Sequence, residues 1–235
     1  MNVVVSILLA PLPSIVWLAF YLRKDKHPEP NRMVIKIFLL GVLMVPVAGI
    51  FEQLFFVGSE KMPIYNRMSL IIIGFALIEE ILKFLVIKFW VLKNSDFDEP
   101  VDAMIYMIIA ALGFAAAENI YLASQLNLLV SPLEFTITRF LGATFLHALA
   151  SAIIGYFLAA SLLIVSKIRK ILVIGGILTA TVLHSIFNYI IILNSQQIIN
   201  GIGRDLCLLI LLVGMALIVS VMFKKINKYR SICKI

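Results

Sequence analysis

Apolar blocks of about 20 residues recur along the whole chain, and this pattern restricts its fold more than any other feature. A helix needs roughly 20 apolar residues to cross a hydrocarbon core about 30 Å thick. The sequence predicts seven such spans, at about 2–22, 33–57, 68–92, 102–125, 135–166, 171–194 and 205–223. Composition agrees, because 62% of the 235 residues are hydrophobic and only 14% are charged. We therefore predict an all-α, polytopic transmembrane helix bundle that forms a single domain over residues 1–235.

The distribution of basic residues predicts the orientation of this bundle. Thirteen lysines and arginines fall in the tail after residue 223 and in the connections 23–32, 93–101 and 167–170, whereas three fall in the alternate connections. The positive-inside rule then places the N-terminus outside and the C-terminus in the cytoplasm. This asymmetry explains the net charge of +7. The sequence shows no basic stripe with interleaved aromatic residues, so we expect contact with the lipid bilayer and none with nucleic acid.

Four of the predicted spans carry ionisable side chains deep inside the membrane, namely Glu79, Glu80, Glu118, His147 and His184. At about 1.5 Å per residue, Glu118 falls roughly 10 Å below the outer face and the other four roughly 15–18 Å below it. A charge at such a depth costs several kcal/mol unless it is paired or hydrated. A role limited to joining helices is the alternative for any single residue. The common depth instead predicts that the five converge on one polar cavity.

Other charged residues lie closer to the ends of the spans. Lys36, Lys88 and Arg139 are near enough to a membrane boundary for their long side chains to reach it, so we expect all three to snorkel. Glu52 lies near the other end of the span that contains Lys36. The sequence assigns it no role.

Helical spacing divides the deep residues into pairs. Residues four apart share one face of a helix, so Glu79 and Lys83 are natural partners, as are His184 and Asn188. The adjacent Glu79 and Glu80 point about 100° apart and cannot both meet Lys83 in the same way. We expect the lysine to hold one carboxylate and the other to face the cavity, where it can act as a general base or acid.

These residues also form motifs that resemble a known family. The stretch EEILK resembles the EExxK motif of PrsW-type intramembrane proteases, which belong to the superfamily of CAAX-processing and bacteriocin-immunity membrane proteases. Three further motifs follow in order, FAAAE from Phe114 to Glu118, His147 with Gly155, and HSIFN from His184 to Asn188. The resemblance extends over nearly the whole chain.

The resemblance implies hydrolysis of a peptide bond inside or beside a bacterial plasma membrane. The substrate it implies is a membrane-anchored protein cut near its extracytoplasmic boundary, such as an anti-sigma factor at the first step of regulated proteolysis. The catalytic set is then Glu79, Glu80, Lys83, Glu118, His147, His184 and Asn188. Glu79 or Glu80 would deprotonate the attacking water. Zinc is the expected cofactor, with His147, His184, Glu80 and Glu118 as ligands, although a metal-free glutamate mechanism uses the same residues.

Two other classes of membrane protein also fit the deep polar residues. Midplane carboxylates and histidines form proton relays in transporters, so a proton-coupled transporter is the first alternative. Against it, the sequence shows no inverted repeat and predicts no matched pair of broken helices. The second alternative is a non-catalytic immunity or scaffold protein, against which the intact motifs argue.

Overall fold

The computed structural model of the chain describes residues 2–24, 27–61, 63–125, 131–164 and 168–229, and every regular element within them is helical. Parts of the basic connections 23–32 and 167–170 and of the C-terminal tail lie outside these residues. The helices are α1 (Asn2–Leu9), α2 (Leu12–Leu22), α3 (Asn31–Gly58), η1 (Ser59–Lys61), α4 (Ile64–Trp90), α5 (Asp102–Ser124), α6 (Pro132–Leu141), α7 (Ala143–Leu162), α8 (Ile168–Ser195) and α9 (Gly201–Ile226).

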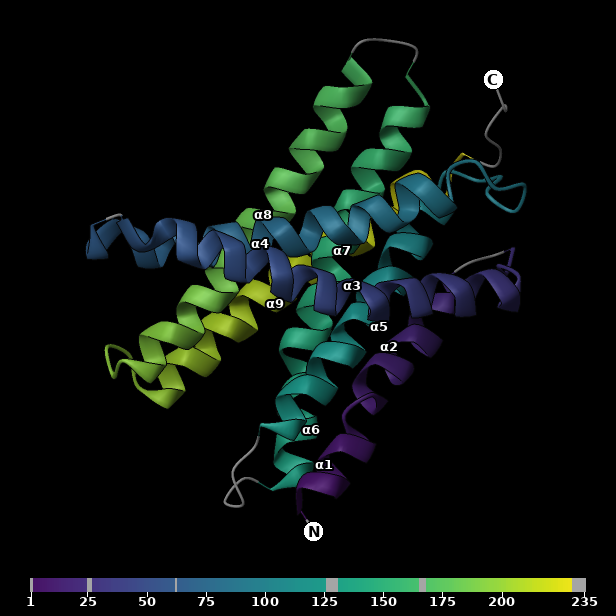
Figure 1. Cartoon of the computed structure of the whole chain (residues 1–235). Helices are drawn as coiled ribbons and strands as arrows, with labels where there is room; N and C mark the ends of the chain where they lie inside the picture. Colours follow the sequence, from purple (N-terminus) through teal and green to yellow (C-terminus); the bar gives the residue numbers. More distant parts are fainter. Residues whose placement is uncertain (1, 25–26, 62, 126–130, 165–167, 230–235) are drawn as a thin grey trace.

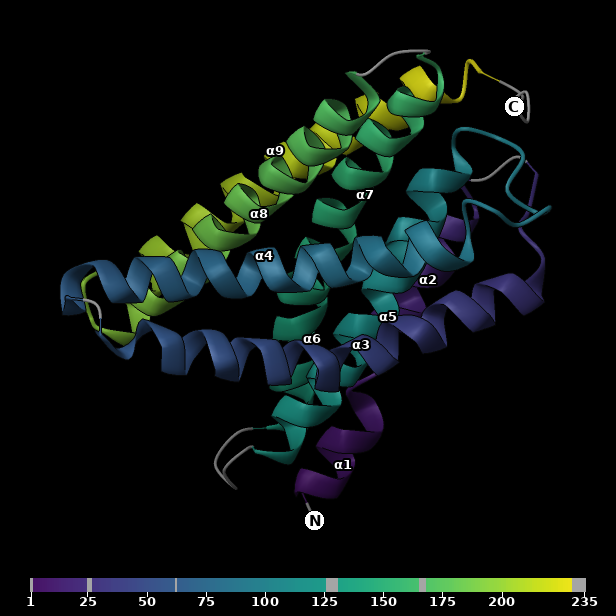
Figure 2. The same ribbon diagram turned by 45° about the horizontal axis from the view of Figure 1, so that its top comes forward.

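Helix α5 lies at the centre of the bundle, and most of its residues are buried. It packs against α3 on one side and α7 on another, while α4 lies beside α3 and crosses over the central helices (Figure 1). Helices α8 and α9 form an antiparallel pair next to α7, which a second view shows clearly (Figure 2). The N-terminal end of α1 and the C-terminal end of α9 lie on opposite sides of the molecule (Figure 1). Which side faces the cytoplasm stays a prediction.

The membrane-spanning character of the fold agrees with the sequence. Among the described residues, six helical segments are long and apolar enough to cross a membrane, with α1 and α2 forming one of them and α6 and α7 another. The long helix α4 is not among the six, because its sequence includes the charged residues Glu79, Glu80 and Lys83. The helix with the weakest membrane signal is therefore the one that carries the EExxK motif.

Two of the predicted spans are interrupted, although the sequence indicated no matched pair of broken helices. The span 2–22 divides at Pro11, where a proline cannot donate the backbone hydrogen bond of a continuing helix. The span 135–166 divides at Gly142, whose dihedral angles of φ −105° and ψ −104° are not helical. A Cβ at Gly142 would lie 2.8 Å from the Thr138 carbonyl oxygen, so the absence of a side chain permits this bend.

Side chains satisfy backbone carbonyl groups at both breaks. Asn119 Nδ2 donates to the Ala10 carbonyl oxygen at 3.2 Å, and Trp17 Nε1 donates to the Phe140 carbonyl oxygen at 2.9 Å. In hydrocarbon no water is available for these groups, and an unsatisfied one costs several kcal/mol. Because α6 packs against α1 and α2, the two interrupted spans support each other.

Small residues let the central helices approach closely. A Cβ at Gly113 would lie 2.0 Å from the Phe38 carbonyl oxygen, and one at Gly41 would lie 2.1 Å from the Ala110 carbonyl oxygen. These two glycines bring the backbones of α3 and α5 into direct contact. Small residues are the usual means of close helix packing in membranes, where lipid is as apolar as leucine.

We expect Gly113→Ala to separate α3 from α5 and to lower the free energy of unfolding by about 1–3 kcal/mol, the usual cost of an added methyl group in a packed core. Thermal unfolding in detergent measures this change. Gly49→Ala is the matched control, since a Cβ there meets nothing within 4 Å. Equal stability of the two variants would contradict the close contact.

Candidate active site

The Lys83 ammonium group is the centre of a buried polar cluster. Its Nζ atom donates to Glu80 Oε1 at 2.9 Å and to His147 Nδ1 at 2.8 Å, and it lies 3.4 Å from Glu79 Oε2. The lysine side chain is fully buried, and Nζ also lies 4.6 Å from the centroid of the Phe114 ring. One cation therefore joins both carboxylates of the EExxK motif on α4 to a histidine on α7.

The two adjacent glutamates have different surroundings. Glu80 is fully buried and accepts hydrogen bonds from Lys83, from Ser151 Oγ at 3.3 Å and from His184 Nδ1 at 3.0 Å. Glu79 keeps 12% of its side chain exposed. Its distance to Lys83 Nζ is 3.4 Å, which is longer than that of Glu80. The carboxylate that Lys83 holds most closely is therefore Glu80, although helical spacing alone made Glu79 its natural partner.

A second chain of contacts reaches the cluster through Glu118 on α5. The Glu118 carboxylate accepts from His147 Nε2 at 3.0 Å and from the guanidinium group of Arg139. Arg139 Nε also donates to Asn119 Oδ1, and Asn119 Nδ2 donates to Thr144 Oγ1 at 3.0 Å. The expectation that Arg139 snorkels is wrong, because α6 holds its guanidinium group against Glu118 and Asn119.

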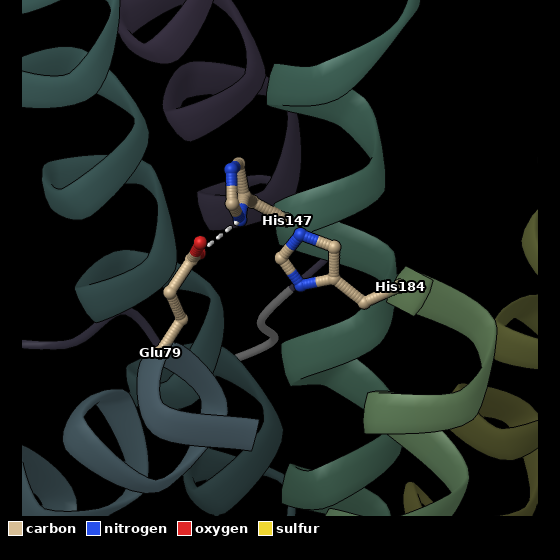
Figure 3. A group of neighbouring side chains, drawn as sticks. All are labelled: Glu79, His147 and His184. Atoms are coloured by element: carbon tan, nitrogen blue, oxygen red, sulfur yellow. Dashed lines mark ion pairs between the residues drawn. The ribbon is translucent and has the colours of Figure 1, made fainter. Parts of the chain in front are cut away.

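Three side chains form a group that could hold a metal ion. Ligand atoms of Glu79, His147 and His184 all lie within 4.8 Å of one another. Figure 3 shows the three side chains converging, with His147 Nδ1 at 3.8 Å from Glu79 Oε2. Each histidine uses its other nitrogen for a carboxylate, since His147 Nε2 meets Glu118 and His184 Nδ1 meets Glu80.

This arrangement differs from the predicted ligand set. The sequence named Glu80 and Glu118 as ligands beside the two histidines, whereas in the structure these carboxylates contact the ring nitrogens that point away from the shared group. Glu79 takes the carboxylate position among the potential ligands. The spacing could not separate the two roles, because Glu79 and Glu80 are adjacent and both point toward α7 and α8.

The structure brings together six of the seven residues expected in the catalytic set, namely Glu79, Glu80, Lys83, Glu118, His147 and His184. The seventh, Asn188, lies one turn after His184 on α8 and is half-buried. It makes no hydrogen bond to the cluster within the described part of the chain.

Sequence reasoning missed three polar residues that support the cluster, namely Asn119, Arg139 and Ser151. Asn119 and Ser151 are fully buried, and each donates a hydrogen bond to another helix, Asn119 to Thr144 on α7 and Ser151 to Glu80 on α4. The sequence did offer Arg139 a partner, because Glu118 is a carboxylate without a predicted partner inside the neighbouring span. Only the packing of α6 against the rest of the bundle shows that the two side chains meet.

Exposure of the cluster increases toward α6. The side chains of Lys83, Glu80, His147 and His184 are at most 3% exposed, whereas Glu118 is 27% exposed. Glu118 and the Arg139 side chain beside it thus form the most accessible edge of the site. A molecule that approaches the cluster from this edge meets charged groups before the histidines.

We expect Lys83→Met to lower the free energy of unfolding by about 3–5 kcal/mol, because it leaves the Glu80 carboxylate buried without its cation. Glu80→Gln added to Lys83→Met should restore part of this loss. A double-mutant cycle of unfolding in detergent measures the coupling. Lys88→Met, at an exposed position on the same helix, is the control and should change little. Strictly additive effects would contradict a direct ion pair.

Comparisons with known proteins agree with this geometry. A model of PrsW family intramembrane metalloproteases matches residues 29–222. Protease PrsW of Geobacillus kaustophilus is 32% identical over 173 residues, which are 74% of this chain and 73% of the relative. Protease PrsW of Oceanobacillus iheyensis is 33% identical over 182 residues, covering 76% and 79%.

A third relative, Protease PrsW of Clostridioides difficile, is 26% identical over 225 residues, which cover 94% of this chain and 90% of the relative. No solved structure matches the chain. The family match includes all five helices that contribute to the polar cluster, from α4 to α8. The chain therefore belongs to the PrsW family of intramembrane metalloproteases.

Proposed function

We propose that this membrane protease is a zinc-dependent endopeptidase that cuts a membrane-anchored protein near its extracytoplasmic boundary. The observation that carries the proposal is the group formed by Glu79, His147 and His184, whose ligand atoms lie within 4.8 Å of one another inside the helix bundle. Two imidazoles and one carboxylate are a protein ligand set typical of catalytic zinc, which keeps a further position open.

The surroundings of the group also fit a cation. Zinc-bound histidines usually donate their second N–H to a carboxylate, which fixes the ring, and Glu80 and Glu118 occupy these positions. The ammonium group of Lys83 contacts two of these ligands, His147 Nδ1 at 2.8 Å and Glu79 Oε2 at 3.4 Å, so a bound ion would take the place of these contacts. The cluster contains three carboxylates and two fixed cations, an excess of one negative charge that a divalent ion would offset.

Bound zinc would polarise the scissile carbonyl group and lower the pKa of water. The residues of the chain have separate tasks around it. Glu80 orients His184, and Glu118, itself held by Arg139, orients His147. Lys83 contacts both Glu79 and Glu80. The amide of Asn188, which makes no hydrogen bond to the cluster among the described residues, is a candidate donor to the carbonyl oxygen of the substrate as negative charge develops there.

The substrate is expected to be a single-span protein with an extracytoplasmic segment, of which an anti-sigma factor at the first cut of regulated proteolysis is an example. Two features support this proposal. The predicted topology places the Glu118 end of α5 toward the outer face. The most exposed part of the cluster is also at Glu118, so a chain that descends from outside would reach this edge first.

A proton-coupled transporter and a non-catalytic immunity or scaffold protein are the alternatives from other classes. The two interrupted spans remove one sequence argument against transport, since broken helices form ion sites in many transporters. Membership of the PrsW family nevertheless favours hydrolysis. Proton flux in liposomes without cleavage would favour transport, and full function of a Glu80→Ala variant would favour a scaffold.

We expect purified protein to bind one zinc ion, and His147→Ala or His184→Ala to weaken binding strongly because each removes a ligand. Isothermal titration with zinc and metal analysis of purified protein measure this. A chelator such as phenanthroline should abolish cleavage. Full activity in metal-free buffer would instead support a glutamate-only mechanism, with the histidines as hydrogen-bond donors to the oxyanion.

A second experiment tests proteolysis itself. Cells that carry the wild type should release membrane-protein fragments that are lost in the double variant Glu79→Ala, Glu80→Ala, because that variant removes a ligand and an orienting carboxylate together. Quantitative proteomics of membranes and medium measures the fragments and locates each cut. Glu60→Gln is the control, as Glu60 is exposed near the end of α3. Cuts confined to cytoplasmic segments would contradict the predicted side of entry.

A further inference from the structure

The reaction needs a base that can take a proton from water, and the three carboxylates of the cluster already have other partners. Glu80 is fully buried against Lys83 and His184. Glu118 is held by Arg139 and His147. Glu79 belongs to the potential metal ligands. A carboxylate that is fixed by two charged or ring partners is poorly placed to accept and return a proton.

A fourth carboxylate, that of Glu52, comes from α3. Residues three and four apart lie on one face of a helix, so Glu52 shares a face with Ala48 and Phe55. Ala48 is buried in a cluster with Leu82 and Phe114. The Phe55 ring packs on Gly74, where a Cβ would lie 2.3 Å from the ring. These contacts place Glu52 opposite the part of α4 between Gly74 and Leu82, the part that contains Glu79 and Glu80.

The surroundings of Glu52 are those of an available group. Its side chain is half-buried, and within the described residues it makes no hydrogen bond or ion pair. It lies within electrostatic range of charged groups on all three neighbouring parts of the cluster, namely Glu79 and Lys83 on α4, Glu118 on α5 and His184 on α8. An unpaired carboxylate inside a membrane helix is costly, and its presence beside this cluster points to a use there.

We propose that Glu52 is the general base of the reaction, an inference that rests on the proposed protease function. Its carboxylate takes one proton from the attacking water as the water oxygen bonds to the carbonyl carbon of the substrate. The C–N bond then breaks, and Glu52 returns the proton to the leaving nitrogen. The products are one carboxyl group and one amine, so no further reactant is needed.

This assignment gives each acidic residue of the site a different task. Glu79 is a ligand, Glu80 and Glu118 orient the histidines, and Glu52 moves the proton. It replaces the expectation from sequence that Glu79 or Glu80 is the base. It also explains why the base comes from a helix outside the EExxK motif: a proton carrier must approach the reacting water without being held by Lys83.

The variant that tests the role is Glu52→Gln, which keeps the shape of the side chain and removes the base. Release of the fragments that depend on Glu79 should fall at least about a hundredfold, the usual contribution of a general base. Glu52→Asp should retain part of the activity. Bound zinc per protein and the melting temperature should stay at the wild-type values in both variants. Gln53→Ala, the exposed neighbour on α3, should behave as wild type.

Each outcome decides between specific alternatives. Fragment release by Glu52→Gln within about threefold of wild type would overturn the role of Glu52 alone. Loss of bound zinc or a lower melting temperature in that variant would show that Glu52 holds the site together and is not the base. If wild type itself releases no fragments that depend on Glu79, the protease function fails, and the inference about Glu52 fails with it.

Discussion

The ion pair between Lys83 and Glu80 is the interaction on which the rest of the structure depends. Both side chains are fully excluded from solvent inside a bundle whose core is mainly apolar. A lone charge there would cost several kcal/mol, so each group requires the other. Because His147 and His184 bond to the same pair, helices α4, α7 and α8 are fixed relative to one another by one set of contacts.

The breaks in two membrane spans are part of the same arrangement. A continuous helix through Gly142 would carry Arg139 in a fixed direction relative to α7, whereas the bend lets α6 present it to Glu118. Asn119, the residue after Glu118, bonds to Arg139 and to the carbonyl group of Ala10 at the other break. The two breaks in the backbone and the side chain of His147 are therefore connected by hydrogen bonds through Asn119, Arg139 and Glu118.

The proposed mechanism gives each carboxylate of the site a separate task. A ligand must be held near the ion, an orienting group must be held against a histidine, and a base must be free to accept a proton. One residue cannot meet these requirements at once. Under the proposed roles, the burial of Glu80, the partial exposure of Glu79 and the lack of a hydrogen bond or ion pair to Glu52 among the described residues fit the three requirements.

The sequence alone determined the helical membrane fold, because the length of the apolar blocks sets it. From the rise of a helix it also predicts a common depth for the deep polar residues. It also identified Glu79, His147 and His184 as neighbours. It could not separate the roles of Glu79 and Glu80, nor pair Arg139 with Glu118, because these depend on how helices rotate and where they bend. Only tertiary packing decides which face of each helix meets which partner.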